Sequence, residues 1–329
     1  MLFGRSLFAS DWAQAILAGA ALAQPAPDCG KATTSSEKAI CGNPELAAAD
    51  RMMGMTFAAL FKILPPEQQT GLRESQRQWV GARDVACSEA RDAALTTCLL
   101  GETEKHRRFL AGEGANGPTA APKLLPVFFD QTKKGLYEIT IEYPQFAPPA
   151  GAKFDRAVRD LTMDPKTLSE YRQVEPNRNT GASNFYQVGY ETTYLDLRLV
   201  SVTLQFSAYG GGAHPNTWRS TMLWDPTSDK PMELADFLAA PKTAVPAIGA
   251  VCRDKLAVEA KAEDWDFFDN ADFGAVVGDP KTWAVDKDGV TILFNPYSVA
   301  AYVVGPRDCR LSYAELKDWL KPGGVLPPR

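Results

Sequence analysis

The sequence predicts an α+β fold in two parts: a helical hairpin tied by disulfides, then an α+β domain with a largely antiparallel sheet. Apolar residues recur at helical spacing before residue 110, whereas alternating, strand-like runs dominate after it. The stretch AGEGANGPTAAP at 111–122, rich in Gly and small residues, separates the two regions as linkers do. The length of 329 residues also suits two compact units.

The first residues have the pattern of a signal peptide. Arg5 precedes the apolar run WAQAILAGAALA, and small residues end this run at the −3 and −1 positions of a cleavage site after Ala23. No later stretch reaches the roughly 20 apolar residues of a membrane span, so we expect a periplasmic or secreted protein without one. The predicted segments are a signal peptide at 1–23, a helical domain at 24–110, a linker at 111–124 and an α+β domain at 125–329.

The charge of the chain limits its partners. A formal net charge of −5 argues against binding to nucleic acid. Residues 24–110 contain 11 basic and 11 acidic side chains, whereas residues 118–329 contain 23 basic and 27 acidic ones, a net charge of −4. The acidic surplus of the second part suits a basic partner.

Two helices are expected in the first part. Asn43 is a suitable N-cap with Pro44 in the first turn, and PPEQ at 65–68 ends one helix and begins the next. The expected inward positions are Leu46, Met53, Phe57, Leu60, Phe61 and Leu64 on the first helix, and Leu72, Trp79, Ala86, Ala90 and Ala94 on the second.

One stripe of the second helix combines polar and apolar residues. Gln76, Trp79, Arg83 and Cys87 follow at steps of three and four, and Asp50 on the first helix is expected near Arg83. We interpret Asp50, Trp79 and Arg83 as structural residues that form a salt bridge beside a core tryptophan.

The six cysteines all lie beyond the predicted cleavage site, and an even number in an exported chain predicts disulfides. The absence of C-x-x-C argues against a thiol oxidoreductase or a zinc ribbon. Four cysteines allow three pairings, but facing residues of a hairpin have numbers with a nearly constant sum. This geometry predicts nested bridges Cys41–Cys87 and Cys29–Cys98 in the hairpin. Cys252 and Cys309 remain, and a bridge between them would pin a later helix to the C-terminal segment.

The first part combines Cys29, the pattern IC..PEL...D from Ile40, the pattern Q..W...RD..C from Gln76, a fourth cysteine, and the R..L pair that begins at Arg107. With this combination, residues 29–110 resemble the LprI family of exported lysozyme inhibitors. The resemblance implies a small helical, disulfide-tied domain in the periplasm or at the cell surface. Only some members of the family are implied to inhibit lysozyme.

Strands and helices alternate irregularly in the second part. LYEITIEYPQF at 136–146 is a strand, 150–161 is a helix, and 185–217 is a hairpin that ends in YGGGAHPNT. A helix around Cys252, a strand in GVTILFNPY and a helix in LSYAELKDWL follow. This order predicts helices packed on a mostly antiparallel sheet.

Three groups of residues follow one another in the second part: Gly211, Gly212, Ala213, His214, Pro215 and Asn216, then Phe294, Pro296, Tyr297, Ala300, Tyr302 and Gly305, and finally Tyr313 and Leu316. With these residues, positions 125–318 resemble the extracellular domain of the anti-sigma factor RsiV, a domain also attached to peptidoglycan deacetylases. The resemblance implies a receptor whose loops occupy the substrate cleft of lysozyme. The cytoplasmic and membrane-spanning parts of RsiV have no counterpart here, so only the lysozyme-binding surface carries over.

Several roles are open for His214. A zinc site normally uses several His or Cys ligands, whereas this chain has two histidines, and its cysteines are expected to be paired. Ser207 and Ser220 lie nearby without a G-x-S-x-G motif, so a hydrolytic triad lacks support. We therefore expect His214 to shape the turn or to contact a partner, and we expect His106 to be a solvated helix residue.

The stretch EAKAEDWDFFDNADFG at 259–274 combines six acidic residues with four aromatic ones. It lacks the spacing of an EF-hand, and sequence cannot give the separation that a pair of glycosidase carboxylates requires. We interpret it as a solvated loop anchored by its aromatic residues, or as a surface for a basic protein.

Together these features predict an exported binding protein without catalytic residues, metal or cofactor, whose partner is lysozyme or a similar cationic cell-wall hydrolase. The residues expected to contact the partner are Gly211, Gly212, His214, Pro215, Asn216, Pro296, Tyr297 and Tyr302. The alternatives are a cell-wall glycan-acting accessory enzyme and a peptidoglycan-binding scaffold.

Overall fold

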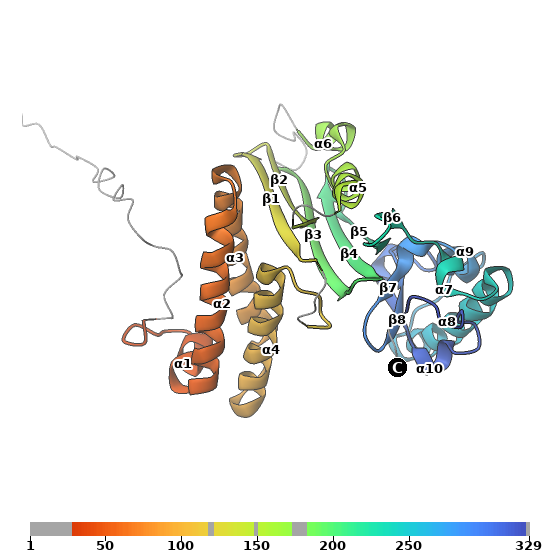
Figure 1. Ribbon diagram of the computed structural model, residues 1–329, viewed down its shortest axis with the longest axis horizontal. Coiled ribbons are helices and arrows are strands. Elements are labelled where there is room, and N and C mark those ends of the chain that lie inside the picture. The colour runs from red at the N-terminus through yellow and green to blue at the C-terminus, as the bar shows by residue number, and fades with distance from the viewer. Residues whose placement is uncertain (1–27, 118–121, 148–150, 173–182, 327–329) are drawn as a thin grey trace, which may run out of the picture.

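The computed structural model describes residues 28–117, 122–147, 151–172 and 183–326. The predicted signal peptide and its cleavage site near Ala23 lie outside the described residues. The α+β fold class is confirmed: helices come first, and a mostly antiparallel sheet follows (Figure 1). The first four helices are α1 (Ser35–Gly42), α2 (Pro44–Ile63), α3 (Pro66–Ala86) and α4 (Asp92–Ala111).

Helices α2 and α3 begin where the sequence predicts. The side chain of Asn43 accepts hydrogen bonds from the backbone N–H groups of Glu45 and Leu46, at 2.9 and 3.2 Å, and Pro44 lies in the first turn. Helix α3 ends earlier than expected, and a separate helix α4 follows. The inward positions predicted at Ala86 and Ala94 are therefore wrong, because both residues are exposed.

The nested disulfides are also wrong. The structure pairs Cys29 with Cys41 and Cys87 with Cys98, across separations of 12 and 11 residues. Constant sums hold for a hairpin of two helices, but residues 35–111 form four helices. Helix α1 carries Cys41 beside the segment just before it, and the turn from α3 into α4 brings Cys98 back to Cys87, so each bridge closes a local loop.

A six-stranded sheet forms the middle of the molecule, with the strands in sequence order. All neighbours are antiparallel except β2 and β3, which are parallel because helices α5 (Ala152–Thr162) and α6 (Pro165–Tyr171) connect them. These two helices cover one face of the sheet, where Phe154, Val158 and Leu168 join the buried core. The strands are β1 (Leu124–Lys133), β2 (Tyr137–Phe146), β3 (Asn184–Leu195), β4 (Val200–Tyr209), β5 (Asn216–Asp225) and β6 (Lys230–Pro231).

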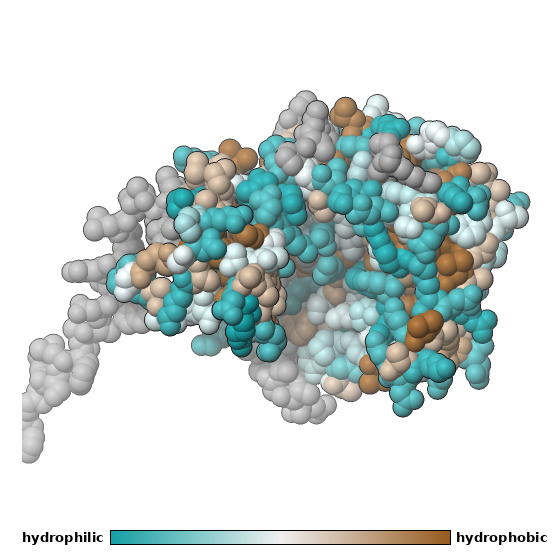
Figure 2. Space-filling model, turned by 90° about the horizontal axis from the view of Figure 1, so that it is seen from below, coloured by the Kyte–Doolittle hydropathy of each residue, from teal (hydrophilic) through white to brown (hydrophobic). Residues whose placement is uncertain are grey.

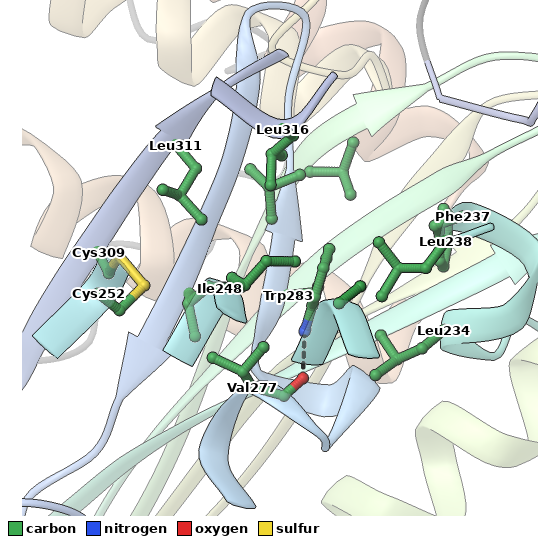
Figure 3. Close-up of a cluster of buried hydrophobic side chains, with 14 of the residues drawn as sticks. Leu234, Phe237, Leu238, Ile248, Cys252, Val277, Trp283, Cys309, Leu311 and Leu316 are labelled. Atoms are coloured by element: carbon green, nitrogen blue, oxygen red, sulfur yellow. Dashed lines mark hydrogen bonds between the residues drawn. A yellow bond between two sulfur atoms is a disulfide. The ribbon is translucent and has the colours of Figure 1, made fainter. Parts of the chain in front are cut away.

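A second, three-stranded antiparallel sheet forms the C-terminal part with helix α8. Its core surrounds Trp283, whose indole N–H donates to the carbonyl of Val277 at 2.8 Å (Figure 3). The predicted bridge between Cys252 and Cys309 is confirmed, and it ties α8 to β9. The elements are α7 (Leu234–Phe237), α8 (Pro241–Glu263), α9 (Phe273–Val277), η1 (Pro280–Thr282), β7 (Trp283–Val285), β8 (Gly289–Phe294), η2 (Tyr302–Val304), β9 (Arg307–Ser312) and α10 (Tyr313–Leu316).

The helical part packs directly on the sheet. Phe128 of β1 is buried in one cluster with Leu72 of α3 and Leu110 of α4. A Cβ atom on Gly71 would lie only 2.6 Å from the Cβ of Phe128, so glycine allows α3 to approach the strand closely. Helices α2 to α4 therefore cover the β1 edge of the sheet (Figure 1).

Within the described ranges, none of the helices is both long and apolar enough to cross a membrane.

Candidate functional site

Two loops that the sequence analysis selected lie side by side. The loop at 210–215 connects β4 to β5, and the loop at 295–306 connects β8 to β9. The side chain of Asn295 joins them: its Oδ1 accepts from the backbone N–H of Arg219 at 2.8 Å, and its Nδ2 donates to the Arg219 carbonyl at 2.9 Å. One amide thus replaces a missing strand partner, and it fixes the second loop against β5.

Glycines give the first loop its sharp path. Gly211 and Gly212 have φ angles of 100° and 115°, which only glycine adopts readily. The hydroxyl of Tyr209 donates to the carbonyl of Gly212 at 3.0 Å and closes the turn. These φ angles explain why the loop contains consecutive glycines.

A stack of aromatic rings covers the junction of the loops. The His214 ring lies on the Tyr302 ring with centroids 4.0 Å apart, and Tyr297 contacts Tyr302 at 5.4 Å. The Tyr302 hydroxyl donates to the carbonyl of Pro215, and His214 Nδ1 donates to the same oxygen at 2.8 Å. These contacts hold His214 through its backbone neighbour and a tyrosine ring, so the turn-shaping role is supported.

The junction leaves apolar groups in solvent. Tyr297 is 59% exposed and Val303 is 91% exposed. Tyr297 also has a φ of 66°, a left-handed conformation that is strained for a residue with a side chain. We call residues 210–216 and 295–305 the paired-loop surface; it brings together all eight residues that the sequence analysis expected to contact a partner.

An acidic hollow lies beside Tyr297. Its volume is 660 Å³, and its walls include Phe268, Asp272 and Asp279. Asp272 caps α9 through a 2.8 Å bond from the backbone N–H of Ala275, and Asp279 caps η1 in the same way. The carboxylates are therefore held in place next to the exposed tyrosine.

The acidic stretch 259–274 is only partly a loop. Helix α8 continues to Glu263, and a left-handed Asp264 ends it. Trp265 and Phe267 then pack against the C-terminal core, as the aromatic-anchor interpretation predicted. Arg307 lies over the Trp265 ring at 4.9 Å and pairs with Glu263 at 2.7 Å.

The predicted structural residues of the helical part do meet. Arg83 of α3 lies 3.8 Å from the carboxylate of Asp50 on α2, and its guanidinium covers the Trp79 ring at 4.8 Å. Burial raises the pKa of Asp50, and the charge of Arg83 opposes this effect.

His106 is not a solvated residue, contrary to the expectation. It is 7% exposed, its ring stacks on Trp79 at 4.1 Å, and its Nε2 lies 2.8 Å from Oε1 of Gln76. The buried residues Leu99, Thr103, His106 and Leu110 form one face of α4. That spacing is visible in the sequence, but it is informative only once α4 is treated as a separate helix.

Burial gives His106 a testable effect on stability. Desolvation, followed by the nearby charge of Arg83, lowers its pKa from 6.5 to about 3. Below pH 6.5 this histidine is therefore protonated in the unfolded chain but stays neutral in the folded protein. The free energy of unfolding consequently falls as the pH drops toward 3. We expect this histidine to account for a loss of roughly 2 kcal/mol between pH 7 and pH 5.

Chemical denaturation of the protein and of His106→Phe at both pH values measures the loss, because phenylalanine keeps the stack but does not titrate. The difference in unfolding free energy between the two proteins should change by that amount. A difference that is the same at both pH values contradicts the assignment.

A groove along the sheet, which the sequence analysis missed, starts beside the paired-loop surface. Asn295 and Pro296 form part of its wall, and residues of β2 to β5 form its floor. Alternating polar residues in these strands, such as Gln187, Gln205 and Ser207, are the signal that could have indicated an uncovered sheet face. In the described segments, no group of three or more His, Cys, Asp or Glu side chains is arranged to hold a metal ion.

Comparisons with known proteins divide the chain into three matches. Residues 29–110 match the family described as lysozyme inhibitor LprI, residues 131–217 match deacetylase PdaC, and residues 235–314 match a protein family of unknown function, DUF3298. No curated protein matches the chain.

Two solved structures of DUF3298 family members align with part of this chain. The protein from Bacteroides fragilis NCTC 9343 is 17% identical with a TM-score of 0.49, and the alignment covers 62% of this chain and 96% of that one. The protein from Pseudomonas aeruginosa PAO1 is 18% identical with a TM-score of 0.45, and the alignment covers 66% of this chain and all of that one, at 100%. The chain thus carries an LprI-like helical segment at its N-terminus, followed by PdaC-like and DUF3298-like segments.

Proposed function

We propose that this protein is exported to the cell envelope, where it binds lysozyme or a similar cationic cell-wall hydrolase and inhibits it by steric occlusion. The observation that carries the proposal is the match of residues 29–110 to a lysozyme inhibitor family. The disulfides of this segment fit an exported protein.

The paired-loop surface is the part we propose to enter the substrate cleft of the hydrolase. Tyr297 and Val303 protrude, while the bonds of Asn295 and Tyr302 hold the loops rigid. A rigid aromatic anchor binds with little loss of conformational entropy, as binding hot spots require. The resemblance of this region to the lysozyme-binding domain of RsiV supports the same role, through Gly211, Gly212, His214, Pro215, Asn216, Pro296, Tyr297 and Tyr302.

The charge around this surface fits a cationic partner. Asp272 and Asp279 line the hollow next to Tyr297, and Asp264, Asp266 and Asp269 are exposed nearby in the sequence. Acidic groups around an apolar anchor accelerate the encounter with a basic protein and fix its orientation. We therefore propose that the contact lies on the C-terminal part of the chain. We also propose that residues 24–110 and 125–329 are its two domains.

A cell-wall clearing assay tests the proposal. Chicken-type lysozyme should lose its clearing activity as the oxidised protein reaches an equimolar amount, because a plugged cleft cannot admit glycan. Clearing that is unchanged at a large excess, for chicken-, goose- and invertebrate-type enzymes alike, contradicts it.

The same assay separates inhibition from catalysis. If the protein itself were a glycan-acting enzyme, it would release wall material without lysozyme, and His214→Ala would abolish that release. Under the occlusion proposal, His214→Ala retains most of the inhibition, because the ring shapes the loop and does no chemistry.

A further inference from the structure

An open groove crosses the face of the large sheet opposite α5 and α6. Helices α3 and α4 cover this face at the β1 edge, and the loop at 295–306 rises over the opposite side. Two cavities of 380 and 470 Å³ fill the space between them, and Gln78 of α3 and Glu142 of β2 line both. Figure 2 looks into the hollow between the helical part and the C-terminal part, where hydrophilic residues dominate. We call it the sheet groove.

The floor of the sheet groove is polar but largely uncharged. Thr140, Gln187, Ser207 and Thr217 are paired in register across β2, β3, β4 and β5, so their side chains form one row on this face. All four line the larger cavity. Three strand spacings of about 4.8 Å make this row roughly 14 Å long. The row therefore offers hydroxyl and amide groups to an elongated ligand.

Each end of the sheet groove holds a buried polar atom that lacks a partner among the described residues. At the α4 end it is the hydroxyl of Tyr190, and at the loop end it is Nε of Arg219. Such atoms are costly in a folded protein and call for an explanation. Both residues line a cavity, so a bound ligand with hydroxyl groups would supply the missing hydrogen bonds.

Gly189 keeps the middle of the floor open. It pairs with Gln205, which in turn pairs with Arg219. A Cβ atom on Gly189 would meet nothing within 4 Å, and its φ lies outside the left-handed region that favours glycine. Glycine weakens a strand interior and often marks a close approach by a ligand. Neither backbone geometry nor packing within the described chain requires it here.

Aromatic rings line the α4 end of the sheet groove. Trp79, Phe109 and Tyr190 belong to the wall of the smaller cavity, and the Phe109 and Tyr190 rings lie 5.2 Å apart. His106 and Arg83 cover the faces of the Trp79 ring, but apolar ring atoms still lie next to hydroxyl and amide groups, which suits a ligand with both C–H and hydroxyl groups. Sugar rings have this character.

Most charged side chains around the sheet groove are paired, although Glu102 at its α4 end has no ion-pair partner among the described residues. Arg219 pairs with Asp308 at 2.7 Å, and Lys105 pairs with Glu191 at 3.1 Å. Burial raises the pKa of Glu142 and so favours its uncharged form, while a hydrogen bond with Ser75 opposes this effect. An anionic ligand would find no unpaired positive charge here, because Lys105, Arg108 and Arg219 are all paired, so an uncharged ligand fits better than an anion.

We propose that the sheet groove binds a neutral oligosaccharide, held by the Tyr190 hydroxyl, the floor row and the open space above Gly189. An extended peptide fits less well. Peptides gain affinity by adding a strand at a sheet edge, whereas the sheet groove lies on a face, where the backbone groups of β2 to β5 already bond to one another. This site is separate from the exposed Tyr297 and does not depend on the lysozyme proposal.

Calorimetric titration of the full chain with chitotetraose and with cellotetraose tests the proposal. Binding of either sugar supports it, and the preferred one distinguishes an N-acetylated wall glycan from an ordinary glucan. Gly189→Phe should weaken binding at least tenfold because the ring fills the sheet groove. Gly101→Phe is the matched control: this glycine also has open space around it, but on the exposed side of α4, and its substitution should change nothing.

Tyr190→Phe separates ligand binding from folding. Because the hydroxyl has no partner among the described residues, its removal should leave the melting temperature unchanged or raise it, yet weaken sugar binding several-fold. The proposal is overturned if neither sugar binds at millimolar concentration, or if Gly189→Phe binds as well as the native protein. A tetra-alanine peptide that binds in the sheet groove when neither sugar does would overturn it as well.

Discussion

Replacement of Cys252 and Cys309 with alanine is expected to lower the free energy of unfolding by about 4 kcal/mol. The bridge closes a loop of 57 residues, which contains the end of α8, α9, β7 and β8. Its loss restores the freedom of this loop in the unfolded chain, and both side chains leave a core where they are fully buried (Figure 3). Guanidinium denaturation of the double variant and of the native protein measures the effect.

The matched comparison is the double replacement of Cys87 and Cys98. That bridge closes only 11 residues, so the same entropy argument gives a smaller loss of about 3 kcal/mol. Peptide mapping of the oxidised protein should find these two cysteines linked. A larger loss for the short loop, or a loss below 1 kcal/mol for the long one, contradicts the role given to the C-terminal bridge.

Tyr297→Gly is expected to change stability and binding in opposite directions. Glycine accepts the φ of 66° without strain, so the free energy of unfolding should stay level or rise by up to about 1 kcal/mol. Lysozyme binding should weaken about 30-fold or more, because a protruding aromatic anchor worth about 2 kcal/mol is lost. Such a trade-off is expected of a strained residue kept for recognition.

The control for Tyr297→Gly is Leu197→Ala. Leu197 is similarly exposed, but it lies in the turn between β3 and β4, at the end of these strands remote from the paired-loop surface. Its replacement should leave lysozyme binding unchanged. If Tyr297→Gly lowers stability and leaves binding intact, the residue is structural and the paired-loop surface is not the contact.

Local rules in the sequence account for much of the fold. The Asn43 cap, the proline turn before α3 and the strand alternation of β2 each depend on neighbouring residues, so they can be read directly. The proximity of Asp50 to Arg83 follows from the antiparallel packing of α2 and α3. The pairing of Cys252 with Cys309 follows because two cysteines remain for one bridge.

Two missed helix boundaries explain the errors. Because α3 stops at Ala86, the chain turns at Cys87 and α4 packs back along α2 and α3, which brings Cys98 to Cys87 and buries His106. The separate helix α1 carries Cys41, which pairs with Cys29. No Gly or Pro marks the turn at Cys87, so the local sequence signal for it is weak.

The two candidate sites also differ in how far the sequence reveals their residues. The residues of the paired-loop surface could be selected from the sequence because its glycines, His214 and Tyr302 lie in two compact segments; their role in binding stays a prediction. The sheet groove was not predictable, because its residues come from α3, four strands and a distant loop, and only the sheet order brings them together. The Tyr190 hydroxyl, which has no hydrogen-bond partner among the described residues, also has no signature in a linear sequence.

Calorimetric titration of the oxidised protein into chicken-type lysozyme tests the central claim most directly. We predict a one-to-one complex whose affinity weakens as salt is added, because acidic groups border the paired-loop surface. The heat of lysozyme binding should fall sharply for Tyr297→Gly and stay unchanged for Gly189→Phe. The account is contradicted if no heat of binding is measured at high micromolar concentration with chicken-, goose- or invertebrate-type lysozyme. The lysozyme-inhibitor match would then be a likeness of fold only.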